Sequence, residues 1–105
     1  MIDKQYLKLD DRMQAAVDEM KHLIASNFPV VEFSVHQGED LERVHLDVVL
    51  DMDETLEVLD LILGRMVELQ IEEGLPLVVI PLPTLERNTA LLKREAQQRA
   101  ALATA

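Results

Sequence analysis

The stretch Val44-His45-Leu46-Asp47-Val48-Val49-Leu50 decides the fold of this 105-residue chain. Every second residue is apolar, a pattern typical of a strand that buries one face. His45 and Asp47 fall on the opposite face. The sequence therefore predicts a strand with one face in the core and a polar face that is available for other contacts.

The preceding segment, residues 30–36, alternates in the same way and predicts a second strand. Its two sets are Val31, Phe33 and Val35 on the apolar side and Glu32, Ser34 and His36 on the polar side. Because Gly38 and the polar run Glu39-Asp40 lie between the segments, we predict a β-hairpin.

Two hairpin registers keep both apolar sets on one face. One register pairs His36 with His45 and Ser34 with Asp47. The other pairs Ser34 with His45 and Glu32 with Asp47. In both registers Ser34, His36, His45 and Asp47 share one sheet face.

Residues 52–73 predict a long helix, and residues 77–82 predict a strand covered on both faces. Asp51 and Glu54 have the spacing of a capping box, and Gly74 and Pro76 end the helix. The residues expected on the buried half of the helix are Leu56, Val58, Leu59, Ile62, Leu63, Met66, Val67 and Leu69. Leu61 and Ile71 fall on the acidic half. Because a crossover connects the second and third strands, we expect them to be parallel and the connection right-handed.

Helices at residues 10–26 and 85 to about 102 complete the predicted order α-β-β-α-β-α. We predict an α+β fold with a three-stranded mixed sheet and helices mainly on one face. We expect residues 1–105 to form a single globular domain, with its core at about 10–83.

The net charge of −10 lies entirely in residues 39–73, which contain twelve acidic and two basic residues. This balance argues against binding to a nucleic-acid backbone, which needs clustered Lys and Arg. There is no cysteine and no apolar run long enough to span a membrane. Since no leader-like pattern follows Met1, we expect a cytoplasmic location. The last helix holds four of the ten bases, Arg87, Lys93, Arg94 and Arg99, and could dock on an acidic surface of its own chain or of another.

Two groups of polar residues are candidate sites. Ser34, His36, His45 and Asp47 form a candidate ligand face, suited to a metal ion or to acid–base chemistry; the alternative is a solvated sheet face. Asp51 and Asp53, with Asp47, are weaker candidates for binding magnesium, and helix capping is the alternative there. We predict no catalytic residues and no cofactor, apart from magnesium at this corner.

The hairpin and crossover resemble the minimal nucleotidyltransferase fold over about residues 14–95. Ser34 and Gly38 fall on the serine and the later glycine of that family's first motif, and Asp47 falls on the second aspartate of its Asp-x-Asp motif. Phe33 replaces the first motif glycine, and His45 replaces the first metal-binding aspartate. The resemblance therefore implies a degenerate copy kept for binding.

We predict a small non-catalytic domain for protein interaction or oligomerisation, whose partner is another protein or a second copy. One alternative is a nucleotide- or metal-dependent enzyme of the nucleotidyltransferase type that uses the hairpin face. In that case Asp47 would bind the metal, Ser34 would contact phosphate, and His36 or His45 would act as a base. Another alternative is a regulatory, antitoxin-like subunit whose acidic residues cover a basic partner.

Overall fold

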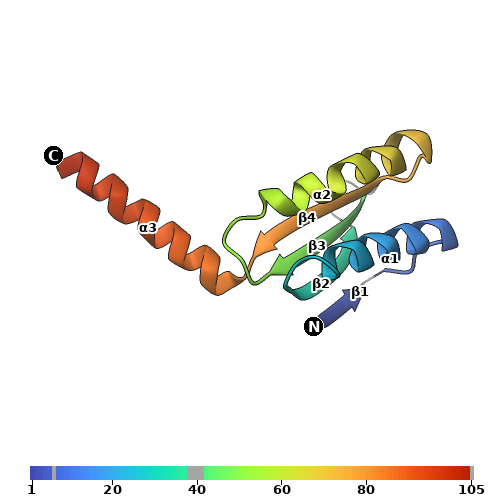
Figure 1. Cartoon of the computed structure of the whole chain (residues 1–105), viewed down its shortest axis with the longest axis horizontal. Helices are drawn as coiled ribbons and strands as arrows, with labels where there is room; N and C mark the ends of the chain where they lie inside the picture. The colour runs from blue at the N-terminus through green and yellow to red at the C-terminus, as the bar shows by residue number, and fades with distance from the viewer. Residues whose placement is uncertain (6, 38–41, 105) are drawn as a thin grey trace.

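The computed structural model describes residues 1–5, 7–37 and 42–104 and shows a mixed α+β fold (Figure 1). Four strands form one sheet in the order β1-β2-β3-β4. Along the chain the elements are β1 (Ile2–Gln5), α1 (Asp11–Ala25), β2 (Val30–Gln37), β3 (Val44–Leu50), α2 (Leu56–Val67), the π-helix η1 (Glu68–Glu72), β4 (Leu77–Pro83) and α3 (Leu85–Thr104).

The fourth strand corrects the prediction of a three-stranded sheet. β1 pairs in parallel with β2, with Ile2 opposite Glu32 and Lys4 opposite Ser34. The order is therefore β-α-β-β-α-β-α. β1 is four exposed residues long and shows no apolar alternation, so its sequence carries no signal for a half-buried strand. β1 belongs to the sheet because it pairs with β2, which follows α1 in the chain.

The hairpin adopts the first of the two predicted registers: β2 and β3 are antiparallel, His36 lies opposite His45, and Ser34 lies opposite Asp47. The register shifts between Val30 and Glu32. Val31 is consequently exposed, contrary to its predicted place on the apolar face, and Val30 packs against the core in its stead. β3 and β4 are parallel, as predicted.

The core lies between the sheet and the helices α1 and α2, which cover the same face (Figure 1). α1 contributes Met13, Ala16, Val17, Met20 and Ile24, and the sheet contributes Phe33, Val35, Val44, Leu46, Val48, Leu50, Leu77 and Val79. The prediction that helices lie mainly on one face is confirmed for these two. The opposite sheet face carries no described helix.

The second helix begins later than predicted, at Leu56, with Thr55 at its N-cap position. The predicted capping box is wrong, because Asp51 lies well before the helix. The Glu54 Oε1 atom instead accepts a hydrogen bond from the Leu56 amide at 2.8 Å. Gly74, with a φ of 65°, follows the π-helix and turns the chain into β4.

α3 leaves the body of the protein and makes the molecule elongated (Figure 1). The Cα radius of gyration is 16.2 Å, whereas a compact chain of this length has about 13 Å. The Thr84 hydroxyl accepts a hydrogen bond from the Arg87 amide at 3.3 Å and so caps the first turn of the helix. None of the side chains described between residues 85 and 102 is buried. No helix in the described ranges is both long and apolar enough to cross a membrane.

Candidate functional site

The structure brings the four predicted ligand-face residues together on the uncovered side of the hairpin. Ser34 and His36 come from β2, and His45 and Asp47 come from β3. The His36 Nε2 atom lies 2.7 Å from the Asp47 Oδ2 atom, and the two imidazole centroids are 5.4 Å apart. All four side chains are half-buried. The carboxylate of Asp47 therefore orients the His36 ring on a surface that solvent reaches.

The surroundings of this pair limit its chemistry. Lys4 neutralises Glu32 at 2.8 Å, and Val49 lies opposite Glu32 in the register. On the β4 side, Val78 lies opposite His45 and Ile80 lies opposite Asp47. A carboxylate-held imidazole can move a proton, but it needs a positioned nucleophile or metal-bound water to catalyse a reaction. No three His, Asp or Glu side chains in the described part of the chain form a group able to hold a metal ion.

The acidic corner after β3 binds an arginine from α3. Arg87 Nε lies 2.8 Å from Asp51 Oδ1, and Arg87 Nη1 lies 3.1 Å from Asp53 Oδ1. The hydrogen bond to Asp51, and to a smaller extent the one to Asp53, raises the pKa of Arg87 above its ordinary value. Two of the three predicted magnesium candidates, Asp51 and Asp53, therefore hold the first turn of α3 against the body in this structure. The clustered carboxylates predicted a cation site, and the cation that they bind here is a guanidinium group.

A second ion-pair cluster, which the sequence analysis did not identify, joins α1 to α2. Arg65 Nε lies 2.6 Å from Glu19 Oε2, and Arg65 Nη1 lies 3.1 Å from Glu68 and 2.8 Å from Glu73. The hydrogen bond from Arg65 lowers the pKa of the Glu19 carboxyl. Arg65 is one of only two bases in the acidic sequence 39–73. A lone base among many acids is the sequence feature that could have indicated this cluster.

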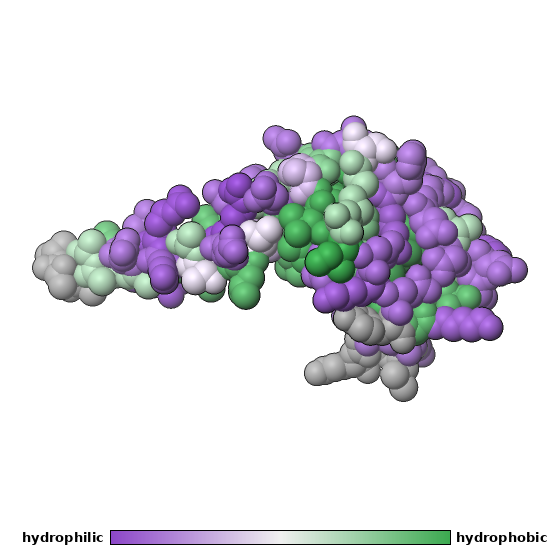
Figure 2. All heavy atoms as spheres, turned by 90° about the horizontal axis from the view of Figure 1, so that it is seen from below, coloured by the Kyte–Doolittle hydropathy of each residue, from purple (hydrophilic) through white to green (hydrophobic). Residues whose placement is uncertain are grey.

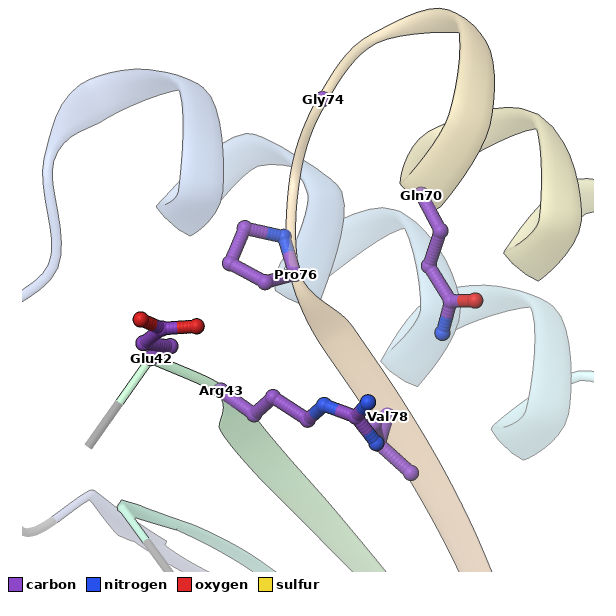
Figure 3. Close-up of a pocket in the computed structure, with 6 residues that line it drawn as sticks. All are labelled: Glu42, Arg43, Gln70, Gly74, Pro76 and Val78. Atoms are coloured by element: carbon purple, nitrogen blue, oxygen red, sulfur yellow. The ribbon is translucent and has the colours of Figure 1, made fainter. Parts of the chain in front are cut away.

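The other base of that sequence, Arg43, lines a cavity of about 350 Å³ together with Glu42, Gln70, Gly74, Pro76 and Val78 (Figure 3). Arg43 extends towards Val78, and Gln70 points from the π-helix towards β4 (Figure 3). The Gln70 amide donates a hydrogen bond to the Leu77 carbonyl oxygen at 2.7 Å. Gln70 therefore connects the π-helix to β4, and its role beside the cavity is structural.

An apolar stripe on α2 is exposed, although three of its four residues were predicted to be buried. Val58, Ile62 and Leu69 face the core, but Leu56 is 61% exposed and Leu63 is 51% exposed. Val67 and Ile71 continue the same line, and Ile71 is exposed as its predicted acidic-side position requires. We call Leu56, Leu63, Val67 and Ile71 the α2 stripe. Two acidic residues lie near the α2 stripe. At a rotation of 100° per residue, Asp60 falls within the stripe and Glu57 falls beside it.

A second exposed stripe runs along α3. Leu85, Thr89, Leu92 and Ala96 recur at four, three and four residues and therefore share one helix face. Leu85 is 80% exposed and Leu92 is 57% exposed. We call these four residues the α3 stripe. At 100° per residue Lys93 and Arg99 flank it closely, and Glu86 and Glu95 lie further from its line. Figure 2 shows hydrophobic surface where α3 joins the body and further along the helix.

No family model matches this chain, and neither does any curated protein or solved structure.

Proposed function

We propose that this protein is a small non-catalytic interaction domain that binds a protein partner through α3. The observation that carries the proposal is the α3 stripe, which is exposed on a helix that projects from the body. In a soluble structure, apolar side chains that recur along one face of a helix are typical of a surface that packs on another element.

The energetics of α3 support this proposal. In proteins most of the stability of a helix comes from tertiary packing of an apolar face rather than from helix propensity. α3 has no described buried side chain, and Arg87 makes the two described ion pairs between α3 and the body. A partner that covers the α3 stripe would supply the missing apolar burial and would hold the helix in place.

Photo-crosslinking tests the proposal directly. A photoreactive amino acid would replace Leu92 in the full-length chain, and the adducts formed in concentrated cell lysate would be identified by mass spectrometry. The matched control replaces Arg94, which lies about 160° around the same helix. We expect adducts from position 92 to exceed those from position 94 several-fold. Equal yields at the two positions, or no adduct at either, would contradict an interaction surface on α3.

A nucleotide- or metal-dependent enzyme is the second candidate, and the 2.7 Å contact between His36 and Asp47 favours it. A ligand that binds only the folded state raises the melting temperature. Magnesium, manganese and zinc, each with and without a nucleoside triphosphate, would be titrated against the wild type and Asp47→Asn. A shift that the substitution removes supports this candidate. No shift with any millimolar ligand rejects it.

A further inference from the structure

The α2 stripe and the α3 stripe are complementary in charge. Asp60 and Glu57 accompany the first. Lys93 and Arg99 flank the second and lie closer to its line than Glu86 and Glu95, which border the same face at 100° per residue. The difference extends beyond these residues. Leu85–Thr104 carries four basic and two acidic residues, and the rest of the chain carries six basic and eighteen acidic residues. Opposite charges beside two apolar stripes favour their packing against one another and disfavour the pairing of like helices.

The two helical surfaces are also similar in length. α3 has 20 residues, which corresponds to about 30 Å at 1.5 Å per residue. α2 and the π-helix together continue from Leu56 to Glu72, about 25 Å by the same rise. An α3 helix can therefore run along the whole α2 stripe.

The anchored first turn of α3 keeps this helix away from the α2 stripe of its own chain. Arg87 is held by both Asp51 and Asp53 at the corner before α2. From this corner α3 projects away from the body (Figure 1). Leu85 and Leu92 lie on the side of α3 roughly opposite to Arg87, at 100° per residue. The helix thus presents its stripe outwards, where a second molecule reaches it.

We propose that the partner of α3 is a second copy of this chain, and that α3 of each copy packs along the α2 stripe of the other. This inference rests on the proposed interaction function and names its partner. The arrangement is closed by a two-fold axis, because each copy contributes one α2 stripe and one α3 stripe. It buries both exposed stripes in two equivalent helix pairs and places Lys93 and Arg99 beside Glu57 and Asp60.

Charge reversal on each helix tests the pairing. One variant carries Glu57→Lys and Asp60→Lys on α2, and the other carries Lys93→Glu and Arg99→Glu on α3. All four side chains are exposed, so neither variant removes a core contact. Sedimentation equilibrium would measure the mass of the wild type, each variant alone, and an equimolar mixture of the two.

We expect the wild type to have twice the chain mass of 11.9 kDa at micromolar concentration. Each variant alone places like charges at both helix pairs, and we expect dimerisation to weaken at least tenfold. In the mixture both helix pairs regain opposite charges, so a heterodimer should form. A monomeric wild type, an unaffected variant or a mixture that stays monomeric would each overturn the proposal.

Leu92→Ser provides a second test should a charge-reversed variant fail to fold. Leu92 is exposed and contributes nothing to the core, so this variant should keep the circular dichroism of the folded body and lose the dimer. A folded Leu92→Ser dimer as tight as the wild type would overturn the proposal.

The crosslinking experiment separates this inference from the proposed function. Adducts at position 92 that contain only this chain agree with both. Adducts that contain a different protein, together with a monomeric wild type, support the interaction function and overturn self-pairing. The absence of any preference for position 92 over 94 rejects both.

Discussion

The helices α1 and α3 are stabilised in different ways. α1 has 15 residues, and five of them are buried against the sheet. α3 has 20 residues, yet none of its described side chains is buried. Both helices start with a side-chain cap, from Asp10 in one and Thr84 in the other. The comparison shows that caps define where a helix begins, whereas burial decides whether it is part of the core.

The difference follows from the apolar spacing of the two helices. In α1, Met13, Val17, Met20 and Ile24 form a continuous stripe of large apolar side chains. The α3 stripe alternates large and small residues and includes Thr89. The first stripe contributes to the core of one chain. The second is too weak to hold a helix on a core, but it suits a partner surface that opposite charges reinforce.

A cavity in α1 should have the largest effect. Ile24 is fully buried, so Ile24→Ala should lower the free energy of unfolding by about 2–5 kcal/mol through lost burial and the cavity left behind. Urea denaturation followed by circular dichroism would measure the change. The matched control on α3 is Leu102→Ala, which is exposed and should change stability by no more than about 0.5 kcal/mol. Equal losses for the two variants would contradict the distinction between α1 and α3.

Removal of Arg65 should have an intermediate effect that depends on pH. The folded-state pKa of Glu19 lies below its ordinary value, chiefly because of the hydrogen bond from Arg65. A lowered carboxyl pKa stabilises the fold above the unfolded-state pKa, and this stabilisation is lost as the pH falls through the folded-state value. Arg65→Gln should therefore be less stable than the wild type at pH 7, and the difference in stability should narrow as the pH falls through the folded-state pKa of Glu19. Denaturation curves across this range would show it. A gap that is constant or widens in acid would exclude Glu19 as the cause.

Release of the α3 anchor should have the smallest effect on the core and a local effect on the helix. Arg87→Gln removes the ion pairs with Asp51 and Asp53, so amide hydrogen exchange in the first turns of α3 should become several-fold faster. Exchange in α1 should not change. Arg94→Gln is the control on the same helix, since no ion pair of Arg94 is described. Similar exchange in both variants would mean that Arg87 does not anchor α3.

Sequence patterns predicted the parts of the fold that depend on neighbouring residues. The alternation in residues 44–50 predicted β3 and its polar face, and its pairing with β2 followed one of two registers. The sequence did not reveal β1, because Ile2–Gln5 is held by a parallel pairing with β2 that forms across α1. The sequence also predicted that Leu56 and Leu63 are buried in the core, whereas both are exposed. Helical periodicity defines a stripe, but it does not tell which part of that stripe another element covers.

The candidate site was predictable in part: the shared face followed from the sequence, but the specific contacts did not. Period-two geometry placed Ser34, His36, His45 and Asp47 on one face. The specific contact between His36 and Asp47 could not be predicted, since it depends on the register and on side-chain rotamers. The partner of Asp51 and Asp53 could not be predicted either, because Arg87 is more than thirty residues away in the sequence. The likeness to nucleotidyltransferases remains a prediction.

In the proposed dimer, the α2 stripe of a second copy covers the α3 stripe. Amide hydrogen exchange of the wild type, measured at low and at high micromolar concentration, tests it most directly. We predict that protection rises with concentration in both α3 and α2 and stays constant in α1. Protection of α3 that does not depend on concentration, or that rises without a matching change in α2, would contradict this account.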